Sequence, residues 1–101
     1  MEGSSRPSPT KDQIVETIID IFVRVIGFIE REEVSASTHP ARDLRIDTDD
    51  LSVFASEVVK HFAIKPTPEE WFRDAGTMEE IAALVLRHLS EAGPQARPDA
   101  Q

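Results

Sequence analysis

The chain has 101 residues and no cysteine, and its 19 acidic residues outnumber its 11 basic ones, which gives a net charge of −8. A chain of this length builds a single hydrophobic core, and the absence of cysteine excludes disulfides, thiol chemistry and thiolate metal sites. The excess of acids argues against a nucleic-acid ligand and favours protein partners with basic surfaces.

Both ends of the chain are poor in apolar residues. Residues 1–9 are rich in Ser and Pro, and residues 91–101 contain the Gly93-Pro94 pair, so we predict disordered tails at both ends. The N-terminal segment lacks the apolar core of a signal peptide, and no apolar run approaches the roughly 18 residues of a membrane span. We therefore expect a cytoplasmic protein without a membrane span, whose folded domain occupies residues 10–90.

The folded region begins with a long amphipathic pattern. The residues T-K-D-Q from Thr10 have the spacing of a capping box, and the apolar residues that follow recur at helical intervals, which predicts a helix over residues 11–30. Residues 31–46 form a predicted long loop, because their Ser and Thr residues and the His39-Pro40 pair disfavour regular structure. We expect three spaced apolar residues to hold this loop on the core: Val34, Leu44 and Ile46.

Three further helices are predicted in the second half of the chain. Helical periodicity predicts one over residues 48–62, and the acids in its first turn suit the positive end of the helix dipole. A Thr-Pro-Glu-Glu start predicts a short helix over residues 68–74, and a capping box from Thr77 predicts the last helix over residues 78–90. The predicted fold is all-α, a small four-helix bundle with three main helices, a short third helix and a long first loop.

The start of the second predicted helix resembles a known signature. Residues 43–50, DLRIDTDD, are similar to the signature D-L-G-x-D-S-L-D of the acyl carrier protein family and match it at four positions. The order of the helices, the F-A-I at residues 62–64 and the pattern of the last two helices are also similar to that family. The resemblance covers about residues 11–90.

This resemblance implies a carrier function and a docking surface. The Ser of the family signature carries a 4′-phosphopantetheine arm, and Thr48 occupies its position here, while Arg45 replaces the Gly and Asp49 replaces an apolar residue. Proteins of this kind dock on partners with basic surfaces. The resemblance points to enzymes of lipid or polyketide-type biosynthesis as such partners. The resemblance places the docking residues in the acidic second helix: Asp47, Asp49, Asp50 and Glu57.

Two interpretations of Thr48 stay open. As an attachment residue, it would make the chain a carrier that bears an acyl or phosphopantetheine group at a non-standard site. As a helix N-cap, a role that Thr fills well, it would belong to an armless interaction or regulatory module with the same fold and no prosthetic group. In both cases we expect a monomeric protein that is not an enzyme.

Two large aromatic residues stand out in the short third helix. Either one of them closes the core, or both line an apolar cleft between the second and third helices in which a carrier could shelter an acyl chain. The residues expected to form this cleft are Phe54, Val58, Phe62, Trp71 and Phe72.

No metal site or catalytic triad is predicted. A calcium loop starting at Asp47 would lack the Gly at its sixth position and the Glu at its twelfth, where Val58 stands. The three histidines, His39, His61 and His88, lack metal-ligand spacing, and the chain has no G-x-S-x-G elbow.

Overall fold

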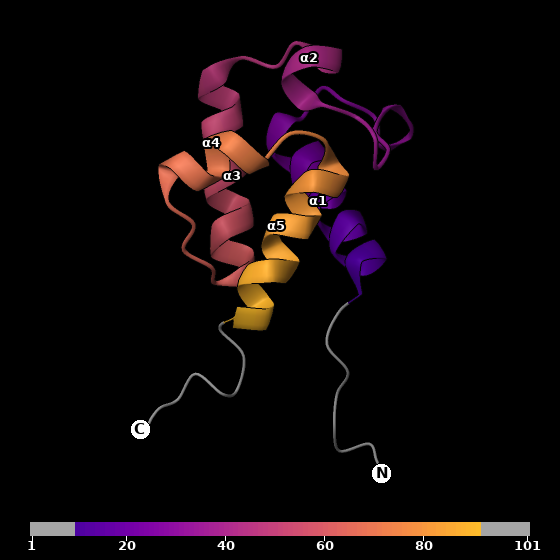
Figure 1. The fold of residues 1–101 in the computed structure, drawn as a ribbon. Helices are drawn as coiled ribbons and strands as arrows, with labels where there is room; N and C mark the ends of the chain where they lie inside the picture. The colour runs from indigo at the N-terminus through magenta and orange to yellow at the C-terminus, as the bar shows by residue number, and fades with distance from the viewer. Residues whose placement is uncertain (1–9, 92–101) are drawn as a thin grey trace, which may run out of the picture.

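Figure 1 shows a computed structural model of the chain, which describes residues 10–91. The described part is all-helical, which confirms the predicted fold class as a small helical bundle. Its elements in chain order are α1 (Lys11–Ile26), the 3-10 turn η1 (Arg31–Glu33), α2 (Pro40–Leu44), α3 (Thr48–Phe62), α4 (Pro68–Asp74) and α5 (Met78–Glu91). Within residues 10–91, no helix has the length and apolar character that crossing a membrane requires. The predicted tails, residues 1–9 and 92–101, lie outside the described residues.

The predicted helices over 48–62 and 68–74 agree with α3 and α4, and α5 extends one residue beyond its predicted end, to Glu91. The helix predicted over 11–30 is wrong at its end, because α1 stops at Ile26. Gly27 takes a left-handed backbone conformation with φ of 85°, and its N–H donates to the carbonyl of Val23 at 3.0 Å. Glycine adopts this conformation without steric cost, and it closes the helix four residues early.

The predicted loop over 31–46 is wrong in part, because it contains η1 and α2. His39 is the N-cap of α2, and its Nδ1 accepts a hydrogen bond from the backbone N–H of Arg42 at 3.1 Å. Pro40 takes the first helical position, where a missing N–H costs nothing. The His-Pro pair, expected to disfavour regular structure, therefore begins a fifth α-helix within the described chain.

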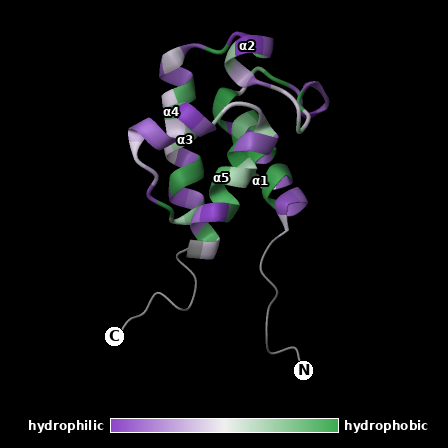
Figure 2. Ribbon diagram, in the orientation of Figure 1, coloured by the Kyte–Doolittle hydropathy of each residue, from purple (hydrophilic) through white to green (hydrophobic). Residues whose placement is uncertain are grey.

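The hydrophobic core lies where α1, α3 and α5 meet. Helices α3 and α5 run in the direction opposite to α1 (Figure 1), and Figure 2 shows hydrophobic residues on the faces that these helices turn toward one another. Phe22 of α1 and Phe54 of α3 meet edge to face, with ring centroids 5.1 Å apart. The expected contacts of the long connection are also present: Val34 and Ile46 are buried, and Leu44 packs against the core.

The connection between η1 and α2 is fastened to the start of α5. The carbonyl of Thr38 accepts the backbone N–H of Met78 at 3.0 Å, and the carbonyl of Ala36 accepts that of Glu79 at 2.8 Å. These N–H groups belong to the first turn of α5, where a helix offers no internal acceptor. The contact therefore gives hydrogen-bond partners to the carbonyls of the connection and to the N–H groups of α5. It also holds α2 at the end of the bundle away from the start of α1 (Figure 1).

A capping box completes the start of α5. Thr77 Oγ1 accepts the N–H of Glu80 at 3.1 Å, and the Glu80 carboxylate accepts the N–H of Thr77 at 2.9 Å. A Cβ at Gly76 would come within 2.2 Å of that carboxylate. A side chain at Gly76 would therefore displace the Glu80 carboxylate from the capping box.

Within residues 10–91, two residues other than glycine have left-handed backbones, one before α3 and one after it. Arg45 ends α2 with φ of 55°, and Ala63 ends α3 with φ of 56°. A residue with a Cβ loses roughly 1–2 kcal/mol in this conformation. The end of α2 and the end of α3 therefore carry backbone strain that a glycine would remove.

We expect Arg45→Gly to raise the free energy of unfolding by about 0.5–1 kcal/mol, because the strain is lost while added freedom of the unfolded chain offsets part of the gain. Gly27→Ala is the control in the opposite sense. At Gly27 φ is 85° and an added Cβ would meet no atom within 4 Å, so its loss of about 1 kcal/mol would report backbone strain alone. Urea unfolding measures the free energy of unfolding of both variants. A lower value for Arg45→Gly would contradict the assignment of backbone strain to Arg45.

Candidate functional site

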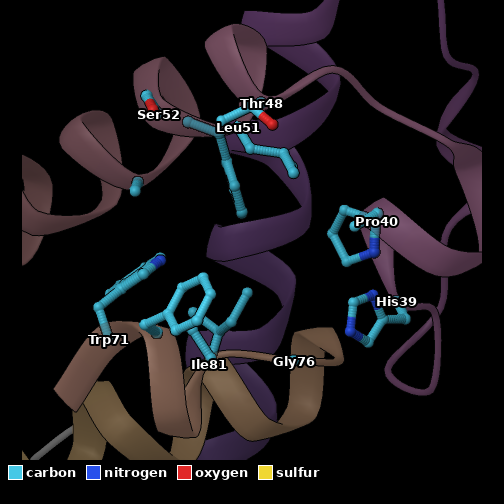
Figure 3. A pocket seen from close by; sticks show the side chains of 13 residues that line it. His39, Pro40, Thr48, Leu51, Ser52, Trp71, Gly76 and Ile81 are labelled. Carbon is cyan, nitrogen blue, oxygen red and sulfur yellow. The ribbon is translucent and has the colours of Figure 1, made fainter. Parts of the chain in front are cut away.

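A cavity of about 480 Å³ opens beside the start of α3. Its volume lies within the range of about 300–1,000 Å³ that is usual for small-molecule sites. Figure 3 shows Thr48 and Leu51 reaching it from α3, His39 and Pro40 facing them from the start of α2, and Trp71 and Ile81 on the opposite side. The cavity thus has walls from four helices.

The residues predicted for an apolar cleft divide into two groups. Phe54, Trp71 and Phe72 line the cavity, whereas Val58 and Phe62 are absent from its lining. Val58 is fully buried in the core, and the half-buried Phe62 places its ring against His61, with centroids 4.8 Å apart. Of the two aromatic residues of α4, Trp71 packs against the core, and Phe72 is 91% exposed.

The wall formed by α2 was missing from the sequence-based prediction. His39 and Pro40 line the cavity, as do Gly76 and Ile81 from the α5 side. The backbone N–H of His39 donates to the Asp43 carboxylate at 2.9 Å, and this bond is the main reason why the pKa of Asp43 lies below its usual value. Together with the bond from the N–H of Arg42 to the His39 ring, this bond caps the start of α2.

Thr48 is the first residue of α3 and is exposed to solvent. Its hydroxyl makes no hydrogen bond with any residue between 10 and 91. The structure places Asp47, not Thr48, at the N-cap, and the Asp47 side chain makes no capping hydrogen bond either. The Thr48 hydroxyl therefore has no capping role at the start of α3. Figure 3 shows it on the side that faces α2.

Three of the four predicted docking acids surround Thr48. Asp47, Asp49 and Asp50 are exposed, and none of them forms a salt bridge within the described residues. Glu57 stands apart, more than two helical turns further along α3. Its carboxylate lies 3.7 Å from Lys60 Nζ, and its side chain is 35% exposed. Of the four predicted docking acids, the three without a salt bridge thus lie together at the start of α3.

The wall formed by α4 is held on α5 by a polar cluster. His88 Nε2 lies 3.0 Å from both carboxylate oxygens of Glu70, and Arg87 pairs with Glu70 and also with Asp74, the latter at 2.9 Å. The hydrogen bond from Arg87, followed by that of His88, lowers the pKa of Glu70. These contacts position α4 and therefore the Trp71 side of the cavity.

The three histidines of the described chain lie on separate elements and do not come together. No group of three or more His, Cys, Asp or Glu side chains in residues 10–91 could hold a metal ion. The lining of the cavity includes one histidine, His39, and the hydroxyl residues Thr48 and Ser52.

Comparison of the chain with known protein families and with curated proteins found no match. Its function must therefore be inferred from the cavity, the Thr48 hydroxyl and the surrounding carboxylates.

The cluster between α4 and α5 generates a prediction about pH. Because the pKa of folded Glu70 lies below its ordinary value of 4.5, its contribution to stability is complete well above that pH. The contribution is lost as pH falls through the folded pKa. We expect Glu70→Gln to lower the midpoint of urea unfolding at neutral pH, and this loss to shrink as the pH falls through the folded pKa of Glu70.

Glu69→Gln is the matched control, because Glu69 is the exposed neighbour in the same helix turn and forms no salt bridge among residues 10–91. It should leave the unfolding midpoint close to that of the unchanged chain at both pH values. An equal loss for Glu70→Gln at neutral and acid pH would contradict the ionic role of Glu70.

Proposed function

We propose that this protein is a carrier-like protein that docks on basic-surfaced partner enzymes through the start of α3, with Thr48 at the centre of the docking surface. The observation that carries this proposal is the Thr48 hydroxyl. It is exposed, lacks a hydrogen-bond partner among the described residues and is flanked by unpaired carboxylates. Hydroxyls that serve to start a helix normally accept a backbone N–H, and this one does not.

We further propose that the bundle is of the acyl carrier type. The resemblance of residues 43–50 to the acyl carrier signature supports this, as does the short α4 between α3 and α5. The backbone gives independent support. The signature has Gly where Arg45 stands, and Arg45 has φ of 55°, a conformation that favours glycine. The backbone at this position therefore suits the residue of the signature.

The docking part of the proposal rests on the charges around Thr48. Asp47, Asp49 and Asp50 have no basic partner within the described chain, so their field is available to a partner. Unpaired charges of one sign raise association rates with an oppositely charged surface and make binding sensitive to salt. Glu57, which pairs with Lys60, would contribute less.

An armless interaction module is the second candidate. The observation that favours it is the chemistry at the attachment position, where Thr48 has a branched Cβ and Asp49 adds a charge in place of an apolar residue. Branching restricts χ1 and crowds the attacking oxygen. Under the first candidate the cofactor is 4′-phosphopantetheine, and under the second there is none. Both share the docking surface.

The two candidates differ in what happens to Thr48 when the protein is expressed with a broad-specificity phosphopantetheinyl transferase and coenzyme A. The carrier proposal expects intact-mass spectrometry to show an increase of one phosphopantetheine, which peptide mapping places on Thr48. Thr48→Ser should raise the modified fraction, because it removes the methyl group beside the oxygen. Thr48→Ala is the control and should stay unmodified.

An unmodified chain in which Thr48→Ser becomes modified would favour the armless module on a carrier scaffold. If neither the unchanged chain nor Thr48→Ser gains mass, the carrier proposal is wrong.

The docking surface can be tested separately through the affinity of the chain for the same transferase. We expect the double reversal Asp49→Lys and Glu57→Lys to weaken binding by roughly tenfold at low salt and to reduce the salt dependence, because attraction becomes repulsion. Surface plasmon resonance over a series of salt concentrations measures both effects. Glu32→Lys with Glu33→Lys, exposed in η1, is the matched control and should bind like the unchanged chain.

A further inference from the structure

We propose that the outward face of α3 is a self-association surface, on which two copies of this chain pair weakly with their α3 helices antiparallel. This inference goes beyond the docking function, because the partner is a second copy of the chain, and neither an arm on Thr48 nor an enzyme is required.

A stripe of four exposed residues runs along α3, which lies at an edge of the bundle (Figure 1). Its members follow one another at intervals of four, three and four positions: Asp49, Val53, Ser56 and Lys60. Residues with this spacing share one face of a helix, and the same alternation is found where two helices pack side by side. The buried Phe54 belongs to the other side of α3, so the stripe faces solvent, and Val53 is 50% exposed.

The charges of the stripe are complementary to those of a second copy. The stripe begins with an acid, Asp49, and ends with a base, Lys60. In an antiparallel pair Asp49 meets Lys60 of the second copy, and two-fold symmetry repeats the contact at the other end. Val53 then meets Ser56 of the second copy. One register produces both pairings, because the midpoint between positions 49 and 60 is also the midpoint between positions 53 and 56.

Both charges are available for such a contact. Asp49 forms no salt bridge among residues 10–91. Lys60 Nζ lies 3.7 Å from the Glu57 carboxylate, but the Lys60 side chain is 77% exposed. An exposed ion pair of this kind contributes little to stability, so Lys60 can exchange Glu57 for an acid of another chain at small cost.

The acids of α3 also decide the direction of the pair. A parallel arrangement would place Asp47, Asp49 and Asp50 beside the same acids of the second copy. In the antiparallel arrangement about 16 Å of helix separates these acids from their copies, which exceeds the Debye length of about 8 Å at physiological salt. The same screening reduces the repulsion between two chains of net charge −8, while charges in contact are screened less.

The size of the stripe sets the strength of the pair. Its four residues include one apolar side chain, Val53, and the small Ser56 lets the helices approach closely. A contact of this size buries less than the roughly 1,200 Å² of a stable interface, so we expect a dissociation constant of about 0.1–1 mM. The chain is therefore monomeric at micromolar concentration and pairs when it is concentrated.

Exchanging the two charges tests the register. Asp49→Lys brings lysines together at both contacts, and Lys60→Asp brings aspartates together, so each variant alone should pair at least about tenfold more weakly than the unchanged chain. An equimolar mixture of the two variants should pair again, because both contacts of the mixed dimer unite opposite charges. Sedimentation equilibrium measures pairing at about 0.15 M salt and protein concentrations up to about 2 mM.

Glu32→Lys is the matched control, because it changes the net charge as Asp49→Lys does but lies in η1, away from the stripe. It should pair at least as strongly as the unchanged chain. If Asp49→Lys pairs like Glu32→Lys, net charge and not the stripe governs association, and the proposal is wrong. A mixture of Asp49→Lys and Lys60→Asp that stays monomeric would overturn the antiparallel register.

A second measurement uses the unchanged chain and does not depend on the folding of any variant, which circular dichroism checks. On concentration, the amide NMR signals of Val53 and Ser56 should shift, while that of Phe22 in the core stays in place. An absence of shifts up to about 2 mM, or shifts confined to other elements, would overturn the proposal.

Discussion

The two backbone hydrogen bonds between residues 36–38 and the first turn of α5 determine much of this structure. The connection between α1 and α3 is long, and its order depends on what it contacts. The carbonyls of Ala36 and Thr38 meet N–H groups that the start of α5 leaves without an internal partner. Because the next residue, His39, is the N-cap of α2, the same contact sets the position of that helix. Without α2 the cavity would lose the wall that contains its histidine, and it would become an open face of α3.

Local signals in the sequence were sufficient to predict α3, α4 and α5, because each of these helices begins with acids or a capping pattern and has an unbroken apolar face. They were insufficient for α1. Apolar residues continue past its end as Phe28 and Ile29, so periodicity alone extends the helix, and the conformation of Gly27 decides otherwise. They were also insufficient for α2, whose five residues are too few for periodicity and whose N-cap is a histidine rather than one of the usual capping residues.

The candidate site was predictable to the extent that it lies on single helices. The Thr48 position and its acids follow from a local segment, and three of the five cleft residues line the cavity. Val58 and Phe62 do not, because the apolar face of α3 is wide enough to divide between two neighbours. Val58 packs into the core, while Leu51 and Ala55 face the cavity. His39 could not be placed from sequence, since only the contact with α5 brings it opposite Thr48.

The left-handed residues at Arg45 and Ala63 have a consequence for the motions of α3. Strain at a helix end lowers the free energy needed to open that end locally, so its amide protons exchange with solvent more readily than those of the core. The core-facing middle of α3, with Phe54 and Val58 buried, is held by packing and does not share this freedom. The segments that flank α3 can therefore open while its buried middle stays packed. In the function that we propose, the start of α3 that meets a partner therefore lies beside one of these strained residues.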